Sequence, residues 1–530
     1  MEQEMQQAGS QHDVLPSDRE TLDIPTSPKE AARNTFYRIY GNSEQSDLIN
    51  NILEQLDYHL SSVTLLATAA HHNKWDIDQL VKEWETQRAK HSETFAAAIE
   101  LSLASPMFQK LGPDARDLLG VVAFFPQGVD ENNLDWLFPT ISNRSSIIDT
   151  SCTLSLTSRN HGFITMPAPT RSHLTPKDPK SSPLLCATKE RYFSRLSVEI
   201  YPDRPGFDEA RWITSEDVNI EYMLDVFTSI DANSDEVWAA CDHFMDHLFW
   251  HKPRLVVLRP KVEGLPDDHP SNSKAKCLSR LAWLFYYIGN FAESKRLHTD
   301  ALKLWKAQGS DSQVANALWG VSRINLMANS EEEGIKHVEE ALAINKRLGD
   351  VWGETRSLRQ LACLLLSDGK FDDAEKTALE VIDRFRDGGE EFQVCACHRV
   401  LGGVCDSRGK TEEAIVHAQA ALKIASRFNW GDRLFWIYYS LAELFTDKRS
   451  FEDAHTHINL ARPYAANNVY CRGRVEELQA WVWSREGKSK EADDAALRAA
   501  GIYETIGATN DIKRCEAHIL DAVRLLKRRV

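Results

Sequence analysis

The most regular pattern of apolar and polar positions lies in the C-terminal half of the chain, from about residue 271 to 526. Amphipathic helical stretches such as Ser357–Leu366 and Tyr438–Phe445 alternate there with short polar turns. After each turn a small or polar residue opens the next helix, and these residues fall at 294, 334, 374, 414, 454 and 492. A fixed period of this length predicts a solenoid of about six helix pairs. Asn510–Arg529 is expected to form a C-terminal capping helix.

Four further segments precede this array. Residues 1–26 are polar and predict a disordered tail. Apolar residues at helical spacing predict a helical domain over 27–92 and a second, linker-like helical domain over 184–258. Residues 93–176 combine helical and strand signals. The expected fold class is therefore mainly α, with one small β-hairpin.

The hairpin is predicted within the segment 93–176. Gly112–Phe125 has the pattern of a core helix, and Asn132–Phe138 that of a short helix ended by proline. Two runs of strand-forming residues, Thr153–Thr157 and Phe163–Met166, then flank a turn that contains Gly162. Helices followed by a hairpin within so few residues indicate a winged-helix domain.

Charge and cysteine usage exclude several classes of function. The chain has 530 residues and a formal net charge of −16, which argues against general nucleic-acid binding. Its 10 cysteines form no C-x-x-C pair and no zinc-type spacing, so we expect reduced thiols and no metal site. The polar N-terminus has no apolar signal core. The apolar run near Leu118–Phe125 is far shorter than the ~20 residues of a membrane helix. These features predict a cytoplasmic protein that does not associate with membranes.

Small residues recur in the second helix of most repeats, seven positions after the residue that opens it. Side chains of this size allow paired helices to approach closely, and they are Ala301, Ala341, Ala421, Ala461 and Ala499. This array resembles tetratricopeptide repeats, in a variant of about 40 residues rather than the usual 34. The resemblance implies a curved solenoid whose first helices line a concave face.

The upstream part resembles the end of an NB-ARC signalling NTPase of the STAND type, as in fungal NOD-like receptors with tetratricopeptide repeats. Leu56–Leu66 is similar to the family's G-L-P-L-A-L box, and Leu118–Phe138 to the start of its winged helix. Phe163–Arg171 lies where the family has its M-H-D motif. The resemblance implies a receptor that couples a repeat sensor to a signalling assembly.

Three departures from this family affect nucleotide binding. Leu60 stands in place of the box proline, and Met166 is followed by Pro167 and Ala168 instead of His and Asp. No G-x-x-x-x-G-K-[ST] sequence is present, and the partial matches Arg408–Thr411 and Glu486–Ser489 coincide with repeat turns. We therefore expect no cofactor. ADP binding belongs only to an alternative in which the chain is a regulatory NB-ARC switch or a fragment of one.

The groove of the resembled repeats binds peptides through recurring positions of the first helices. The matching positions here are rich in arginine and aromatic residues, and they are Lys276, Asn316, Trp319, Arg323, Arg356, Arg359, Arg399, Trp436, Tyr439 and Arg474. Arginine binds carboxylates through paired hydrogen bonds, so one interpretation is a groove for an acidic peptide. The competing interpretation is that these basic residues balance Asp and Glu on neighbouring helices, with the tryptophans packed in the core.

No sequence motif indicates catalysis. The chain has no G-x-S-x-G nucleophile elbow and no H-E-x-x-H box. The predicted function is a non-catalytic interaction scaffold of receptor type, with a peptide or protein as the partner.

Overall fold

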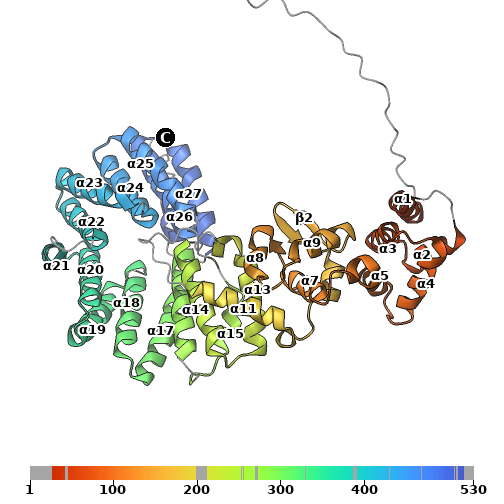
Figure 1. Ribbon diagram of the computed structural model, residues 1–530. Coiled ribbons are helices and arrows are strands. Elements are labelled where there is room, and N and C mark those ends of the chain that lie inside the picture. Colours follow the sequence, from red (N-terminus) through yellow and green to blue (C-terminus); the bar gives the residue numbers. More distant parts are fainter. Residues whose placement is uncertain are drawn as a thin grey trace, which may run out of the picture. The chain divides into compact units, whose positions relative to one another are not determined.

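The computed structural model describes residues 27–41, 46–197, 212–251, 254, 256–268, 272–328, 330–385, 391–428, 430–466, 468–506, 508 and 511–517 (Figure 1). The predicted tail 1–26 lies outside the described residues, as does most of the predicted capping helix, of which 511–517 are helical. The chain divides into two compact units, Met1–Thr188 and Lys189–Val530.

The first unit begins with five helices. They are α1 (Pro28–Tyr40), α2 (Asp47–Gln55), α3 (Leu60–Asn73), α4 (Ile77–Arg88) and α5 (Thr94–Ala104). α3 carries the apolar face that α1 and α5 cover, because its residues from Val63 to Ala70 are almost all buried. Ser27 caps α1 by accepting a hydrogen bond from the Glu30 N–H, and Gly41 ends the helix with a left-handed φ of 84°.

Short helices and a small sheet complete this unit. The helices are α6 (Pro106–Gln109), α7 (Asp114–Phe124), η1 (Glu131–Asn133), α8 (Leu134–Leu137), α9 (Arg144–Thr153), α10 (Ala168–Leu174) and η2 (Pro179–Ser181). The antiparallel sheet has the order β1-β3-β2, with β1 (Val129–Asp130), β2 (Ser158–Asn160) and β3 (Phe163–Thr165). The assignment of these elements to a winged helix stays a prediction.

The hairpin differs from the prediction in its first strand. Thr153–Thr157 was expected to be extended, but Thr153 is the last residue of α9, and Ser155 turns the chain with a left-handed φ of 58°. The strand begins at Ser158, and His161 and Gly162 form the turn with φ values of 51° and 84°. Positive φ at both central residues is the geometry of a tight hairpin turn. The third strand, β1, was not predicted.

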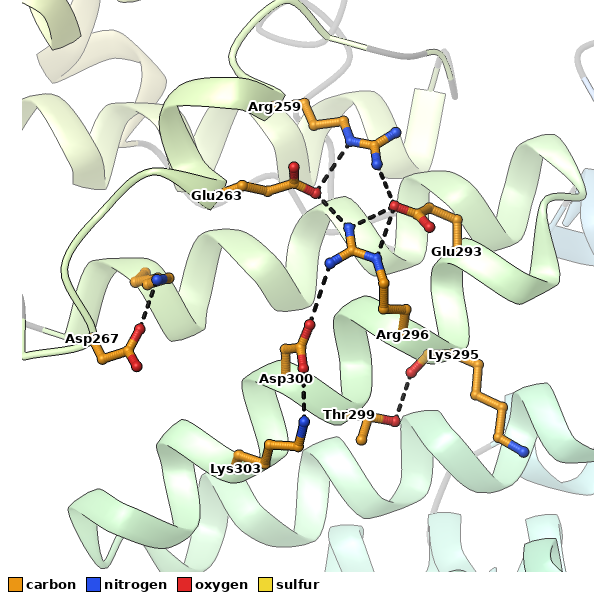
Figure 2. Close-up of polar contacts among 10 residues, drawn as sticks. Arg259, Glu263, Asp267, Glu293, Lys295, Arg296, Thr299, Asp300 and Lys303 are labelled. Atoms are coloured by element: carbon orange, nitrogen blue, oxygen red, sulfur yellow. Dashed lines mark hydrogen bonds and ion pairs between the residues drawn. The ribbon is translucent and has the colours of Figure 1, made fainter.

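Among the described residues, four helices precede the repeats in the second unit. They are α11 (Pro183–Leu196), which begins in the first unit, α13 (Asp217–Ile230), α14 (Asp235–His251) and α15 (Arg259–Glu263). The stretch between the predicted segment 184–258 and the repeat array therefore begins with a short helix. Figure 2 shows the ion pairs that join α15 to the first repeat. Arg296 pairs with Glu263, Glu293 and Asp300, and Arg259 pairs with Glu263 and Glu293.

The predicted solenoid of helix pairs is confirmed. The six pairs are α16 (Ser273–Ile288) with α17 (Phe291–Gln308), α18 (Asp311–Met327) with α19 (Glu331–Leu348), α20 (Val351–Ser367) with α21 (Phe371–Phe385), α22 (Glu391–Ser407) with α23 (Thr411–Phe428), α24 (Gly431–Asp447) with α25 (Phe451–Ala461), and α26 (Val469–Glu486) with α27 (Ser489–Glu504). η4 (Arg462–Ala465) extends α25. The small residues Ala301, Ala341 and Ala421 are each 0% exposed, which allows the close helix contacts.

The first and sixth pairs are in contact, so the array closes on itself (Figure 1). The turn between α16 and α17 contains Gly289, and the ring of Phe291, the first residue of α17, lies 4.9 Å from the Tyr470 ring of α26. Both rings belong to one apolar cluster with Tyr503 and Ile506. This closure forms a cavity on the inner face of the first helices.

Candidate functional site: an arginine-lined cavity inside the repeat array

The cavity inside the closed array has a volume of about 710 Å³ and is lined by the first helix of every repeat. Residues after α27 and the turn at Gly289 complete its wall. This volume falls in the range of sites that enclose a drug-sized ligand, roughly 300–1,000 Å³. The array therefore provides a partly open cavity on its inner face.

The cavity wall is strongly basic although the chain is acidic. Two carboxylates, Glu443 and Asp511, line it, against six arginines: Arg323, Arg359, Arg399, Arg433, Arg474 and Arg514. Low-dielectric walls strengthen such a charge imbalance, because solvent screens it less than on an open surface. The cavity is therefore electrostatically suited to an anion.

Two of these arginines form ion pairs with Glu477 of α26, and Arg514 also pairs with Asp511. Arg514 donates to Glu477 Oε2 at 3.0 Å, and Arg474 does so at 3.2 Å. The Tyr503 hydroxyl donates to the same oxygen at 2.8 Å. Burial alone would raise the pKa of Glu477, but the two arginines lower it below its usual value. This end of the cavity is a satisfied ion-pair cluster.

Arg359 of α20 and Arg433 of α24 have no such carboxylate partner among the described residues. Their residues are only 4% and 6% exposed, and neither Nε atom has a hydrogen-bond acceptor. Both guanidinium groups lie against the ring of Phe392, at 5.8 Å and 4.3 Å from its centroid. Burial, together with the charge of Arg433, lowers the pKa of Arg359 to about 9.

The other inner-face arginines are held against aromatic rings. The Arg323 Nε donates to the Tyr286 hydroxyl at 3.1 Å, and its guanidinium lies 5.0 Å from that ring. Arg399 lies 6.0 Å from the Trp436 ring, and Arg474 lies 4.9 Å from the Tyr439 ring. Stacking against an aromatic ring fixes the orientation of each guanidinium.

Glu443 is the one acidic group of α24 that lines the cavity. Burial raises its pKa to about 7, with Arg474 opposing this effect and Asp406 adding to it. The cavity therefore changes its charge near neutral pH.

The structure brings together half of the predicted binding residues. Those that line the cavity are Arg323, Arg359, Arg399, Trp436 and Arg474. The others are not part of its wall. Lys276 is exposed on α16, Asn316 accepts a hydrogen bond from Arg356, Arg356 lies 4.4 Å over the Trp319 ring, and Tyr439 is buried.

The cavity wall also contains three residues that were not predicted from the sequence, and they are Gln360, Arg433 and Arg514. The signal for Arg433 was its place three residues before Trp436, because residues three apart share a helix face. For Arg514 the sequence offers no comparable signal, since it follows the last repeat.

The described residues contain no group of three His, Cys, Asp or Glu side chains arranged to hold a metal ion. All ten cysteines are free thiols. No helix within the described ranges is long and apolar enough to cross a bilayer.

Comparisons with known proteins identify the fold. No protein-family model and no curated protein sequence matches the chain. Among solved structures, a STAND protein with a tetratricopeptide repeat sensor from Pyrococcus horikoshii is similar over 95% of this chain and 73% of its own, with 12% identity and a TM-score of 0.52. A Rap protein complexed with Competence and Sporulation Factor matches 64% of this chain and 100% of its own, at 11% identity and a TM-score of 0.42. At these identities, the first similarity establishes the fold, a solenoid of tetratricopeptide-like helix pairs.

Proposed function

We propose that this protein is a cytoplasmic, non-catalytic receptor whose repeat array binds an acidic peptide, or an acidic segment of a protein, inside this cavity. The observation that carries the proposal is the excess of arginines in the cavity wall, six against two carboxylates, which persists when Glu477, the partner of Arg474 and Arg514, is included. The upstream unit, which resembles the end of an NB-ARC protein, would couple occupancy of the cavity to a signalling assembly.

The chemistry of the wall favours a peptide over an apolar ligand. Arg323 and Arg399 present guanidinium groups on stacked aromatic supports, and Trp436 and Tyr470 add aromatic surface to the same wall. Arginine forks bind carboxylates through paired hydrogen bonds, whereas aromatic side chains provide apolar contact area. An extended acidic segment with some apolar side chains would satisfy both.

Fluorescence anisotropy with two labelled peptide pools tests this function. One pool is rich in Asp and Glu, and the other carries Asn and Gln at the same positions. We expect only the acidic pool to bind, with an affinity that falls as salt is added.

Arg399→Glu should weaken binding of the acidic pool by roughly 10- to 100-fold, because a charge-assisted hydrogen bond contributes about 1.5–3 kcal/mol. Lys276→Glu, the same charge reversal at an exposed residue outside the cavity, is the matched control. Equal binding of both pools, or an equal loss in both variants, would overturn the proposal.

A further inference from the structure

One part of the cavity wall contains hydrogen-bond donors that nothing in the described chain accepts. They are the Nε atoms of Arg359 and Arg433 and the Nε2 atom of Gln360, all fully buried. All three residues line the cavity. A buried donor without an acceptor costs folding free energy, so a set of three in one place indicates a site that a ligand completes.

The charges at this place are also uncompensated. No carboxylate of the described residues forms an ion pair with Arg359 or Arg433, whereas Arg474 and Arg514 in the same cavity share Glu477. The two guanidinium groups lie 5.8 Å and 4.3 Å from the centroid of the same Phe392 ring, so the two positive charges are within about 10 Å of each other. Gln393 has an unpaired acceptor oxygen, but it is not among the residues that line the cavity.

We infer that Arg359, Gln360 and Arg433 form a subsite for a phosphate ester carried by the ligand. This inference rests on the proposed function and specifies the group that anchors the ligand. A phosphate monoester carries a charge of about −1.5 to −2 at neutral pH and has three strong acceptor oxygens. It would neutralise both guanidinium groups and accept from all three donors.

A carboxylate fits this subsite less well, because a single negative charge would leave one of the two buried arginines unneutralised. The remaining arginines of the wall, Arg323 and Arg399, are already oriented by aromatic rings and would meet other parts of the ligand.

Thermal unfolding of the full chain with three small probes tests the subsite. The probes are O-phosphoserine, glutamate and serine at equal concentration and ionic strength. A ligand that binds only the folded state raises the melting temperature by an amount that increases with the ratio of its concentration to its dissociation constant. We expect a clear rise with O-phosphoserine, a rise at least threefold smaller with glutamate, and none with serine.

Three variants locate the binding. Arg433→Gln and Arg359→Gln should each remove the rise, measured against the melting temperature of the same variant without a probe. Gln360→Met keeps the volume of the side chain but removes the donor, and it should reduce the rise. Lys276→Gln, which removes an exposed positive charge outside the cavity, should leave it unchanged.

Equal stabilisation by glutamate and O-phosphoserine would overturn the requirement for a doubly charged group. A rise that persists in both arginine variants would place the binding elsewhere and would also overturn the inference. The two proposals fail separately. If the acidic pool binds in a way that depends on Arg399 but O-phosphoserine does not raise the melting temperature, only the subsite is overturned. If O-phosphoserine raises the melting temperature but the acidic pool does not bind, only the peptide-receptor proposal is overturned.

Discussion

Phe291, the first residue of α17 in the first repeat, makes an edge-to-face contact with Tyr470 of the last repeat, with ring centroids 4.9 Å apart. The backbone at Gly289 makes this contact possible. A Cβ atom at residue 289 would lie 2.7 Å from both Tyr470 Cβ and Ile506 Cδ1. The closure of the array therefore depends on a position where no side chain fits.

Gly289→Ala should open this closure. Its φ of +91° is left-handed, and Gly369, at the matching turn of the third repeat, has a φ of +75° but open space around it. Both Gly→Ala variants should lose roughly 1–2 kcal/mol of unfolding free energy from the left-handed backbone. Only Gly289→Ala should lose a further ~1–3 kcal/mol from the clash.

Hydrogen–deuterium exchange of α26 and urea unfolding measure these two effects. Faster exchange around Tyr470 is expected in Gly289→Ala and not in Gly369→Ala. If the two variants exchange and unfold alike, the contact with the last repeat does not hold the array closed.

The repeat architecture could be predicted because its signals are local. Turn residues and small residues such as Ala301 and Ala341 recur at a fixed period, and each acts within its own helix pair. The sheet was harder to predict. Its strands have two or three residues each, and α9 continues through Thr153, where β-branched residues suggested a strand.

The cavity follows a different period from the sequence. The repeat steps by 40 residues, but matching wall positions fall at 286, 323, 360, 396, 433 and 470, which are 36 or 37 residues apart. From the second repeat to the fifth, each wall position therefore lies about one helical turn closer to the start of its first helix than the one before it. This shift arises from the twist of the solenoid, so a fixed register selected Lys276 and Asn316 and missed Arg433.

Arg359→Met should stabilise the unliganded protein. The substitution removes a buried positive charge that has no ion pair among the described residues, and a flexible apolar side chain occupies much of the same volume. We expect a gain on the order of 1 kcal/mol in urea unfolding together with loss of phosphoserine binding. Lys276→Met, at an exposed residue, should stay within about 0.5 kcal/mol of the parent. A clear loss of stability in Arg359→Met would show that this arginine supports the fold.

Glu443 should make stability depend on pH near neutrality. Its pKa is raised by burial from 4.5 to about 7 in the folded protein. Between these values the unfolded chain has lost the proton that the folded chain retains, so stability falls as the pH rises from 4.5 to 7 and then levels off. Glu443→Gln removes this dependence.

Urea unfolding at pH 5 and pH 8 checks the effect of Glu443. We compare the unfolding free energy of the variant with that of the parent at each pH. Because the Glu443 side chain is partly exposed, we expect this difference to be only about 1 kcal/mol larger, in favour of the variant, at pH 8 than at pH 5. The same difference between variant and parent at both pH values would contradict a raised pKa.

His298 of α17 should make the protein sensitive to acid. The residue is 1% exposed, and neither ring nitrogen has a hydrogen-bond partner. A Cβ at Gly320 would lie 2.7 Å from His298 Cε1, so the ring has no room for a solvating group. Burial lowers its pKa from 6.5 to about 3.

Between pH 6.5 and 3 the unfolded chain binds a proton at His298 that the folded chain does not, so stability is lost as the pH falls through this window. His298→Leu cannot bind this proton and should remove that loss. Relative to the parent, the variant should therefore gain about 2 kcal/mol between pH 7 and pH 5, since each pH unit within the window contributes about 1.4 kcal/mol. Comparing the pair at one pH would mix this gain with the packing change against Trp283, whose ring lies 4.8 Å from the imidazole. Comparing the variant with the parent at both pH values cancels the packing effect. If the gain of about 2 kcal/mol between pH 7 and pH 5 is not observed, the folded protein accepts a proton at His298.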